Sequence, residues 1–164
     1  MDASLPEPLP KVYLAPEKIT EKVGRSVFLA GSIEMGKADN WQPRLTERLR
    51  DVPCTIFNPR RHHWDTTWEQ RKTNPNFSEQ VNWELDRLHE ADVIAMYFDP
   101  KTTSPITLLE LGLHAADGAD KLVLCCPDGY YRLGNVEVVC ERHNIPVLGS
   151  FDELVEEVKE RLQK

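Results

Sequence analysis

Residues 92–118 read DVIAMYFDPKTTSPITLLELGLHAADG, in which a strand and a helix follow one another closely. The run DVIAMYF is short and nearly all apolar, which is typical of a buried strand. Ser104 and Pro105 predict a helix start, because serine favours the N-cap and proline the first helical position. Gly118 marks the helix end. A buried strand followed by a helix is the unit from which parallel sheets are built.

The same alternation extends in both directions from this unit. Apolar runs predict five strands, at residues 26–30, 54–57, 92–98, 121–126 and 146–148. Helical spacing predicts helices over residues 39–50, from Asn76, over 104–118, over 135–143 and from Ser150. The helices from Asn76 and Ser150 each begin with a capping-box pattern. The expected fold is α/β, a flavodoxin-like doubly wound five-stranded parallel sheet in the order 2-1-3-4-5, with helices on both faces.

Two segments differ from this alternating pattern. Residues 1–25 are rich in proline and predict an extended arm, which Val12, Tyr13 and Leu14 attach to the body. Residues 58–76 form a long polar stretch, and loops of this length are commonly functional lids. We therefore expect a single domain over residues 26–164, with an N-terminal arm and a lid-like loop.

The composition argues against several partners. The 164-residue chain has a net charge of −7, whereas binding a nucleic-acid polymer requires a basic surface. A single nucleotide needs only a few local donors and is compatible with this charge. No apolar run reaches the ~20 residues that cross a bilayer, and the N-terminus lacks the pattern of a secretory signal. These features predict a cytoplasmic protein without a membrane partner.

The cysteines give no metal-binding pattern. Cys54, Cys125 and Cys126 lie in apolar, strand-like runs, where a thiol packs as a small hydrophobe. Cys140 and His143 form a lone C-x-x-H without the second pair that a zinc site needs. We expect reduced core thiols, no metal and no cofactor.

Glu110 stands out in the helix that follows the third strand. Ile106, Leu109 and Leu113 have helical spacing and predict the buried face, and Glu110 falls on that same face. A buried, unpaired carboxylate is costly. Glu110 must therefore be paired, protonated, placed at the edge of the stripe, or functional in a cleft.

A second acid has the same peculiarity. Glu84 lies three residues after Val81 and four before Leu88, so it also points toward the sheet from the preceding helix. Two acids that converge on an apolar cleft repel each other, which raises at least one pKa. In the alternative interpretation, each acid reaches solvent or pairs with a cation such as Arg87 or His114.

The crevice of this fold opens between the carboxyl ends of the first and third strands. Gly31 there allows the backbone to approach a ligand closely, and Ser32 adds a donor. The following helix adds a dipole that favours an anion. Trp64 and Trp68 in the lid-like loop offer rings for stacking on a base, although tryptophans also fill space near the surface of small domains.

A carboxylate nucleophile is suited to attack at an anomeric carbon. It is a weak base but forms esters with oxocarbenium-like centres, as in retaining glycosidases. A nucleobase is the natural leaving group where aromatic rings are available for stacking. The second acid would then position the first or manage protons.

Three motifs resemble nucleoside 2-deoxyribosyltransferases and their relatives, which include nucleoside 5′-monophosphate N-glycosidases. They are FLAGSI at 28–33, NWELDRL and ADVIA within 82–95, and SPITLLELG at 104–112. The resemblance spans residues 26–126 and implies cleavage or exchange of an N-glycosidic bond through a covalent glycosyl-Glu intermediate.

The resemblance implies a role for each acid. Glu110, in the E-L-G motif, corresponds to the nucleophile, and Glu84 stands where relatives commonly have Asp. Two positions depart from the family pattern, because Phe28 replaces a Tyr that orients the nucleophile and Ser104 replaces an Asp. The A-G-S-I loop is closer to the monophosphate hydrolases, whose Ser helps to hold a 5′-phosphate.

The resemblance also implies a nucleoside or nucleotide as the small-molecule partner, and a homo-oligomer in which a neighbour completes the site. Asn135 would then be supplied across an interface. The candidate substrate-binding residues are Gly31, Ser32, Ile33, Asn58, Trp64, Trp68, Ser104 and Asn135.

Two questions stay open at the level of the sequence. Water or a second base can resolve the glycosyl ester, so hydrolase and transferase are not separated. A non-catalytic nucleotide-binding module on the same fold is the alternative to an enzyme, and the departures at Phe28 and Ser104 favour it.

Overall fold

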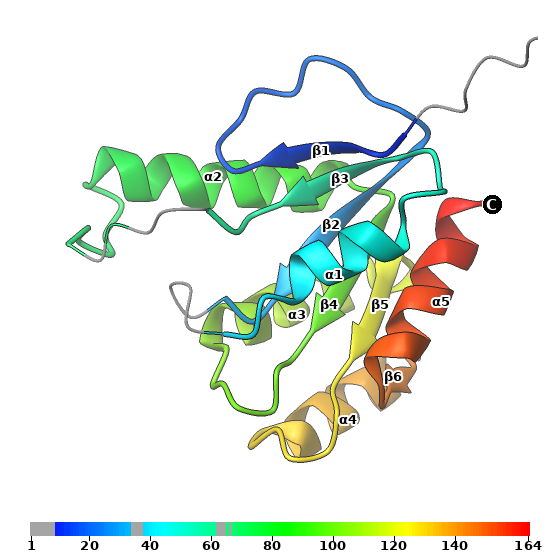
Figure 1. Cartoon of the computed structure of the whole chain (residues 1–164). Helices are drawn as coiled ribbons and strands as arrows, with labels where there is room; N and C mark the ends of the chain where they lie inside the picture. Colours follow the sequence, from blue (N-terminus) through cyan, green and yellow to red (C-terminus); the bar gives the residue numbers. More distant parts are fainter. Residues whose placement is uncertain (1–8, 34–37, 62–64, 66) are drawn as a thin grey trace, which may run out of the picture.

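A sheet of six parallel strands forms the centre of the part of the chain that the structure describes. In the computed structural model, which describes residues 9–33, 38–61, 65 and 67–164, the order is β1-β3-β2-β4-β5-β6 (Figure 1). The strands are β1 Lys11–Leu14, β2 Arg25–Gly31, β3 Cys54–Asn58, β4 Val93–Tyr97, β5 Leu122–Cys125 and β6 Val147–Leu148. The five predicted strands are β2 to β6, and their order confirms the predicted 2-1-3-4-5.

The predicted strand number is wrong by one, because β1 adds a strand at the edge of the sheet. This strand lies within the proline-rich arm and pairs in parallel with β3, so that Tyr13 lies opposite Phe57. Prolines flank β1 without interrupting it, and an edge position tolerates them. The buried Tyr13 side chain donates a hydrogen bond to the Glu21 carbonyl at 2.6 Å, which holds the following segment against the body.

Helices cover both faces of the sheet. They are α1 Trp41–Arg48, α2 Pro75–Glu90, α3 Pro105–Ala115, α4 Leu133–Arg142 and α5 Phe151–Leu162, with a short 3₁₀ turn, η2, at Ala119–Lys121. α1 and α5 lie on one face, while α2, α3 and α4 lie on the other (Figure 1). Within the described part of the chain, no helix has both the length and the apolar character needed to span a membrane.

Two helix starts test the capping predictions. α2 begins at Pro75, and the Asn74 side chain accepts hydrogen bonds from two backbone N–H groups of the first turn. The predicted capping box at Asn76 is therefore wrong, because proline occupies the first helical position and shifts the cap upstream. At α5 the predicted capping box between Ser150 and Glu153 is confirmed.

The apolar stripe of α3 that the sequence predicts to be buried faces outward. Ile106, Leu109 and Leu113 are 58%, 59% and 50% exposed. The buried residues of this helix are instead Thr107, Leu111 and Ala115. This helix is apolar over most of its circumference, so periodicity alone could not indicate which face meets the sheet.

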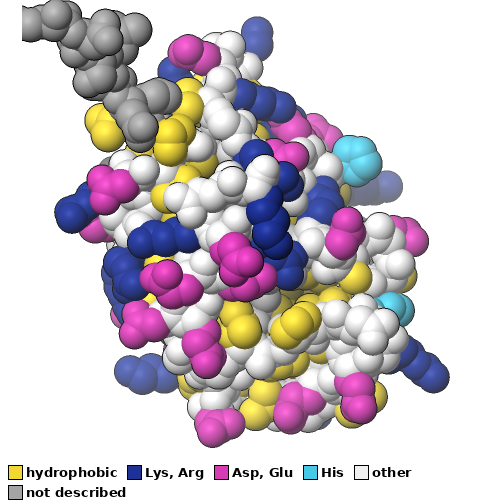
Figure 2. All heavy atoms as spheres, turned by 90° about the vertical axis from the view of Figure 1, so that its right-hand side faces the viewer, with side chains coloured by type: hydrophobic (Ala, Val, Ile, Leu, Met, Phe, Trp, Pro, Cys, Tyr) yellow, Lys and Arg dark blue, Asp and Glu magenta, His cyan; other side chains and the backbone are white. Residues whose placement is uncertain are grey.

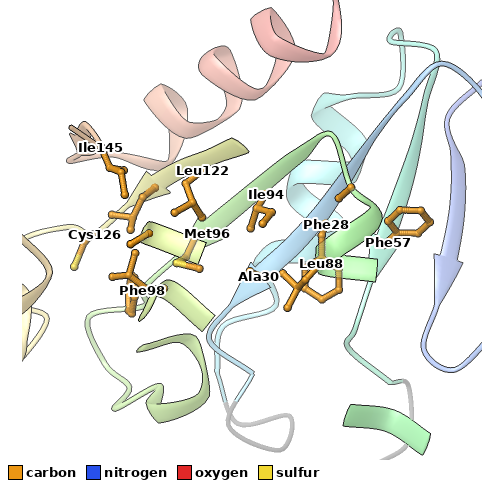
Figure 3. Close-up of a cluster of buried hydrophobic side chains, with 14 of the residues drawn as sticks. Phe28, Ala30, Phe57, Leu88, Ile94, Met96, Phe98, Leu122, Cys126 and Ile145 are labelled. Carbon is orange, nitrogen blue, oxygen red and sulfur yellow. The ribbon is translucent and has the colours of Figure 1, made fainter. Parts of the chain in front are cut away.

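Aromatic and aliphatic side chains fix α2 on the sheet. Figure 3 shows Phe28, Phe57 and Leu88 within the hydrophobic core on the α2–α4 side of the sheet. The ring centroid of Trp83 lies 6.4 Å from that of Phe28 and 6.5 Å from that of Phe57. Because Trp83 and Leu88 are both buried, the position of the neighbouring Glu84 is set by this core.

Candidate active site

Glu110 lies on α3 at the edge of the face that meets the sheet. Its Oε2 atom is buried and has no hydrogen-bond partner among the residues that the structure describes. Burial, and in second place the charge of Glu84, raise the pKa of Glu110 to about 8. The structure therefore places a carboxyl with a strong tendency to hold a proton beside the exposed side chains of Ile106 and Leu113.

Glu84 lies on α2 and faces the same region. Its Oε1 atom accepts a hydrogen bond from Gln80 Nε2 at 3.1 Å. Burial raises the pKa of Glu84 to about 7, while the Gln80 bond and the positive charge of Arg61 oppose the rise. Since the charge of Glu84 acts on Glu110, the structure brings together the two acids that the sequence singled out.

The ionisation of Glu84 affects that of Glu110, because the charge of Glu84 is one cause of the raised pKa of Glu110. Their pKa values of about 7 and about 8 lie well above the ordinary value of a glutamate. One ionised carboxylate disfavours ionisation of the second, so near neutral pH Glu110, which has the higher pKa, keeps its proton while Glu84 is partly ionised. An ionised acid beside a protonated one is the arrangement that enzymes use to divide nucleophilic and proton-transfer roles.

Two further residues, Gln80 and Arg61, belong to this cluster and are not among the residues predicted from the sequence. The buried Gln80 donates from Nε2 to the Pro59 carbonyl at 3.0 Å, and its Oε1 accepts from Arg61 Nε at 2.5 Å. The bond to Pro59 places this turn of α2 at the carboxyl end of β3. A signal for Gln80 existed, because it precedes Glu84 by four residues and shares its helix face. No comparable pattern indicated Arg61.

The lid-like segment contributes an aromatic ring to this cluster. The Arg61 guanidinium lies over the ring of Trp68, 4.8 Å from its centroid. Trp64, the other predicted stacking residue, lies outside the described residues. Asn58 is buried at the end of β3, and its Oδ1 accepts from the backbone N–H of Arg60 at 2.9 Å. Asn58 therefore shapes the turn that leads to Arg61.

Gly31 ends β2 at a place without room for a side chain. A Cβ atom there would overlap the carbonyl oxygen of Tyr97 and lie 2.7 Å from the ring of Trp41. Packing against β4 therefore requires glycine, independently of any ligand. The next two candidate residues follow directly, with Ser32 buried and Ile33 partly buried.

Three hydroxyl groups join the loops that follow β2 and β4. Ser32 Oγ lies 2.9 Å from Thr102 Oγ1 and 2.5 Å from Ser104 Oγ, and it accepts from the backbone N–H of Asp99 at 2.8 Å. The predicted capping bond of Ser104 is wrong, since its side chain caps no backbone N–H of α3 among the described residues. Its hydroxyl contacts Ser32 and Thr102 instead. This cluster fixes the start of α3, and with it Glu110, relative to β2.

The remaining candidate, Asn135, is exposed on α4, and no described interaction joins it to either acid. The cysteines are buried and free, and burial raises their pKa values to about 11 for Cys54 and Cys140 and about 12 for Cys125 and Cys126. No cluster of three or more His, Cys, Asp or Glu side chains suited to a metal ion occurs among the described residues.

The fold and the site together define a doubly wound α/β protein with two partly buried acids, both of raised pKa, on the helices before and after β4. The family model described as nucleoside 2-deoxyribosyltransferase like matches residues 24–130, which is more than half of the chain. The chain belongs to this nucleoside 2-deoxyribosyltransferase-like family, and the matched region contains both Glu84 and Glu110. Membership suggests nucleoside deoxyribosyltransferase-like activity on a nucleoside. A search of curated proteins gave no match.

Proposed function

We propose that this protein cleaves or exchanges the N-glycosidic bond of a (deoxy)nucleoside or nucleoside 5′-monophosphate, with Glu110 as the nucleophile. The observation that supports this most strongly is the buried Oε2 of Glu110, which lacks a partner among the described residues and lies near Glu84. A buried acid without a partner opposes folding, and such groups are concentrated at functional sites.

In the proposed reaction, a carboxylate oxygen of Glu110 bonds to the anomeric carbon while the bond from that carbon to the base breaks. The electron pair of the broken bond leaves with the base. In the free protein Glu110 has the higher pKa, so the reaction requires the proton to pass from Glu110 to Glu84. Positive charge that develops at the anomeric carbon favours this shift, because it stabilises the ionised form of Glu110. Glu84 then gives this proton to the departing base. Water or a second base then opens the ester. The enzyme is a hydrolase if water attacks and a transferase if a second base attacks.

Substrate binding is assigned to the crevice beside β2. The loop of Gly31, Ser32 and Ile33 and the start of α3 at Ser104 would hold the sugar 5′ end or its phosphate. Hydroxyl groups both donate and accept, so the hydroxyl cluster described above offers either partner to a substrate oxygen. Trp68 offers a ring next to the acid pair for contact with the base.

An exposed apolar surface supports a homo-oligomer as the functional form. Ile106, Leu109 and Leu113 are the exposed apolar side chains of α3; Val138 and Val139 are those of α4, and the exposed Tyr131 lies just before α4. Figure 2 shows hydrophobic side chains gathered on the lower half of one face, at the height where Figure 1 places α4 and β6. Contiguous apolar surface of this kind marks interaction sites. A second copy would cover the edge of Glu110 and bring Asn135 of α4 to an interface.

A specific observation favours a second candidate, a non-catalytic nucleotide-binding module. Phe28 stands where the resemblance expects a tyrosine, and it is buried against Trp83. No hydroxyl at this position orients Glu110. Such a module would bind nucleotides equally well after Glu110→Gln and would never release a base.

The proposal is tested by incubating the protein with 2′-deoxynucleosides and their 5′-monophosphates and measuring the released free base by chromatography. Glu110→Ala should reduce the release to background, and Glu84→Gln should lower the rate by about 10²- to 10⁴-fold, as expected for loss of a general acid. Glu79→Ala, which changes an exposed acid of the same helix, is the matched control and should leave the rate unchanged. Activity that survives in Glu110→Ala would rule out the assigned nucleophile.

Light scattering of the purified protein tests the proposed oligomer. We expect Leu109→Asp to lower the molar mass to that of a single chain, because it places a charge in the exposed apolar surface. Glu79→Asp should not change the mass. A wild-type protein that is already monomeric at the assay concentration would remove Asn135 from the proposed site.

A further inference from the structure

Arg61 has an unusual environment for a loop arginine. Its Nε donates to Gln80 Oε1, its guanidinium lies over the ring of Trp68, and its Nη2 atom is buried. That buried nitrogen has no acceptor among the residues that the structure describes. A buried guanidinium N–H without an acceptor is unfavourable, which indicates that its acceptor belongs to a bound molecule.

Gln80 fixes this guanidinium relative to the acid pair. The amide nitrogen of Gln80 is bonded to the Pro59 carbonyl and to Glu84 Oε1, and its oxygen is bonded to Arg61. The side chain thus has a defined orientation, and it links Arg61 to Glu84 through one residue. The positive charge of Arg61 is also close enough to lower the pKa of Glu84. Arg61 therefore lies close to the acid that, in the proposed function, gives its proton to the departing base.

The charges around Arg61 distinguish between two kinds of acceptor. A phosphate dianion near this position would be repelled by whichever of Glu84 and Glu110 is ionised. A carbonyl oxygen of a nucleobase carries no net charge before the reaction and accepts well from a guanidinium. As the glycosidic bond breaks, negative charge spreads onto that oxygen, and a preorganised donor then becomes more effective.

We propose that Arg61 is a specificity-determining residue whose Nη2 donates a hydrogen bond to the carbonyl oxygen at C6 of a leaving purine or at C4 of a leaving pyrimidine. The proposal rests on the proposed function of the acid pair and adds a substrate class, nucleosides of oxo-bases rather than of amino-bases. The electron pair of the broken bond is delocalised toward the carbonyl oxygen beside Arg61. The proton from Glu84 goes to a base nitrogen, and Arg61 stays protonated throughout.

Pairs of nucleosides that differ in a carbonyl against an amino group test this assignment. 2′-Deoxyinosine is compared with 2′-deoxyadenosine, and 2′-deoxyuridine with 2′-deoxycytidine, in the wild type, Arg61→Gln and Arg61→Lys. We expect Arg61→Gln to lower kcat/KM by about 10²-fold for the oxo-base of each pair, as for removal of one oxyanion donor, and much less for the amino-base. Arg71→Gln, an exposed arginine of the same segment, is the matched control and should change neither value.

The ratio within each pair separates substrate contact from a structural effect. If Arg61 only positions Glu84 or supports the loop, Arg61→Gln lowers kcat/KM by the same factor for both nucleosides of a pair, and the proposal is wrong. An unchanged rate for both members overturns it as well. Thermal melting of each variant identifies any loss of folding, and Arg61→Lys retains the charge if Arg61→Gln does not fold. We expect Arg61→Lys to recover only part of the preference, because its ammonium lacks the fork of donors.

Binding of the free bases hypoxanthine and adenine, measured by calorimetry in Glu110→Gln, makes the two proposals separable. Tighter binding of hypoxanthine that is lost in the Arg61→Gln, Glu110→Gln double variant supports the Arg61 contact even if no nucleoside is ever cleaved. Glu110-dependent cleavage without any preference between oxo- and amino-bases refutes the Arg61 contact and leaves the proposed function standing. Absence of both cleavage and Arg61-dependent binding refutes both.

Discussion

The ionisation of Glu110 couples the candidate site to the stability of the fold. The pKa of this carboxyl is about 8 in the folded protein and 4.5 for the free side chain, and burial is the main cause of the difference. Below pH 4.5 both folded and unfolded chains hold the proton, so the ionisation of Glu110 adds no pH dependence to the free energy of unfolding. Between pH 4.5 and 8 only the unfolded chain ionises freely, so stability falls as pH rises.

Replacing Glu110 by glutamine should remove this pH dependence. We expect the free energy of unfolding of the wild type to fall by a few kcal/mol between pH 5 and pH 8, and that of Glu110→Gln to fall less, so that the variant is the more stable at pH 8. Denaturant titrations at several pH values provide the measurement. Glu79→Gln should follow the wild type, whereas parallel curves for wild type and Glu110→Gln would show that the carboxyl is not desolvated.

The pair of acids also predicts a bell-shaped dependence of kcat/KM on pH. The reaction requires one ionised and one protonated carboxyl, so the rate should rise near pH 7 and fall again near pH 8. Below this window both acids are protonated, and above it both are ionised. Glu84→Gln should abolish the alkaline limb together with most of the rate. An unchanged alkaline limb in that variant would assign the limb to another group.

At the scale of single elements, apolar periodicity indicated where strands and helices lie but not how each helix is turned. Short apolar runs predicted β2 to β6, since buried parallel strands are apolar on both faces. The sheet-facing side of α3 was not predictable, because apolar residues occupy several of its faces and the small Thr107 and Ala115 are the ones that meet the sheet. The position of Glu110 at the boundary between the two faces follows from this orientation.

Leucines on the two faces of α3 should respond differently to truncation. Leu111 is buried, so Leu111→Ala should lower the free energy of unfolding by about 2–5 kcal/mol. Leu109 is exposed in the single chain, so in dilute solution Leu109→Ala should change that free energy by less than about 0.5 kcal/mol. Equilibrium denaturation measures both values. A larger loss for Leu109 than for Leu111 would mean that α3 is turned the other way.

At the scale of the whole molecule, the order of the sheet was predictable and the neighbourhood of the acids was predictable only in part. The doubly wound order follows from the alternation of strands and helices. β1 was missed because a four-residue strand between prolines gives little local signal and pairs with β3 across more than forty residues. Arg61 was missed for a similar reason, since its contacts with Gln80 and Trp68 depend on how the segment after β3 folds over α2.

Removal of residues 1–14 tests the contribution of β1 to the whole sheet. The truncated chain exposes the edge of β3, so we expect a lower melting temperature and greater aggregation than for the full chain. Tyr13→Phe is a milder variant that removes the hydroxyl bonds to the carbonyl and N–H of Glu21 and to the Thr20 hydroxyl. It should lower the free energy of unfolding by about 1–3 kcal/mol. Equal stability of the truncated and full chains would show that β1 is dispensable for the fold.

The most direct test of the proposed chemistry is the intact mass of the protein after rapid acid quenching of a reaction with 2′-deoxynucleosides or their 5′-monophosphates, with peptide mapping of any modified species. We predict a species heavier by one sugar or sugar-phosphate group, with the modification on the peptide that contains Glu110, and its complete absence in Glu110→Gln. Release of free base without any adduct, or an adduct mapped to another residue, would contradict Glu110 as the nucleophile.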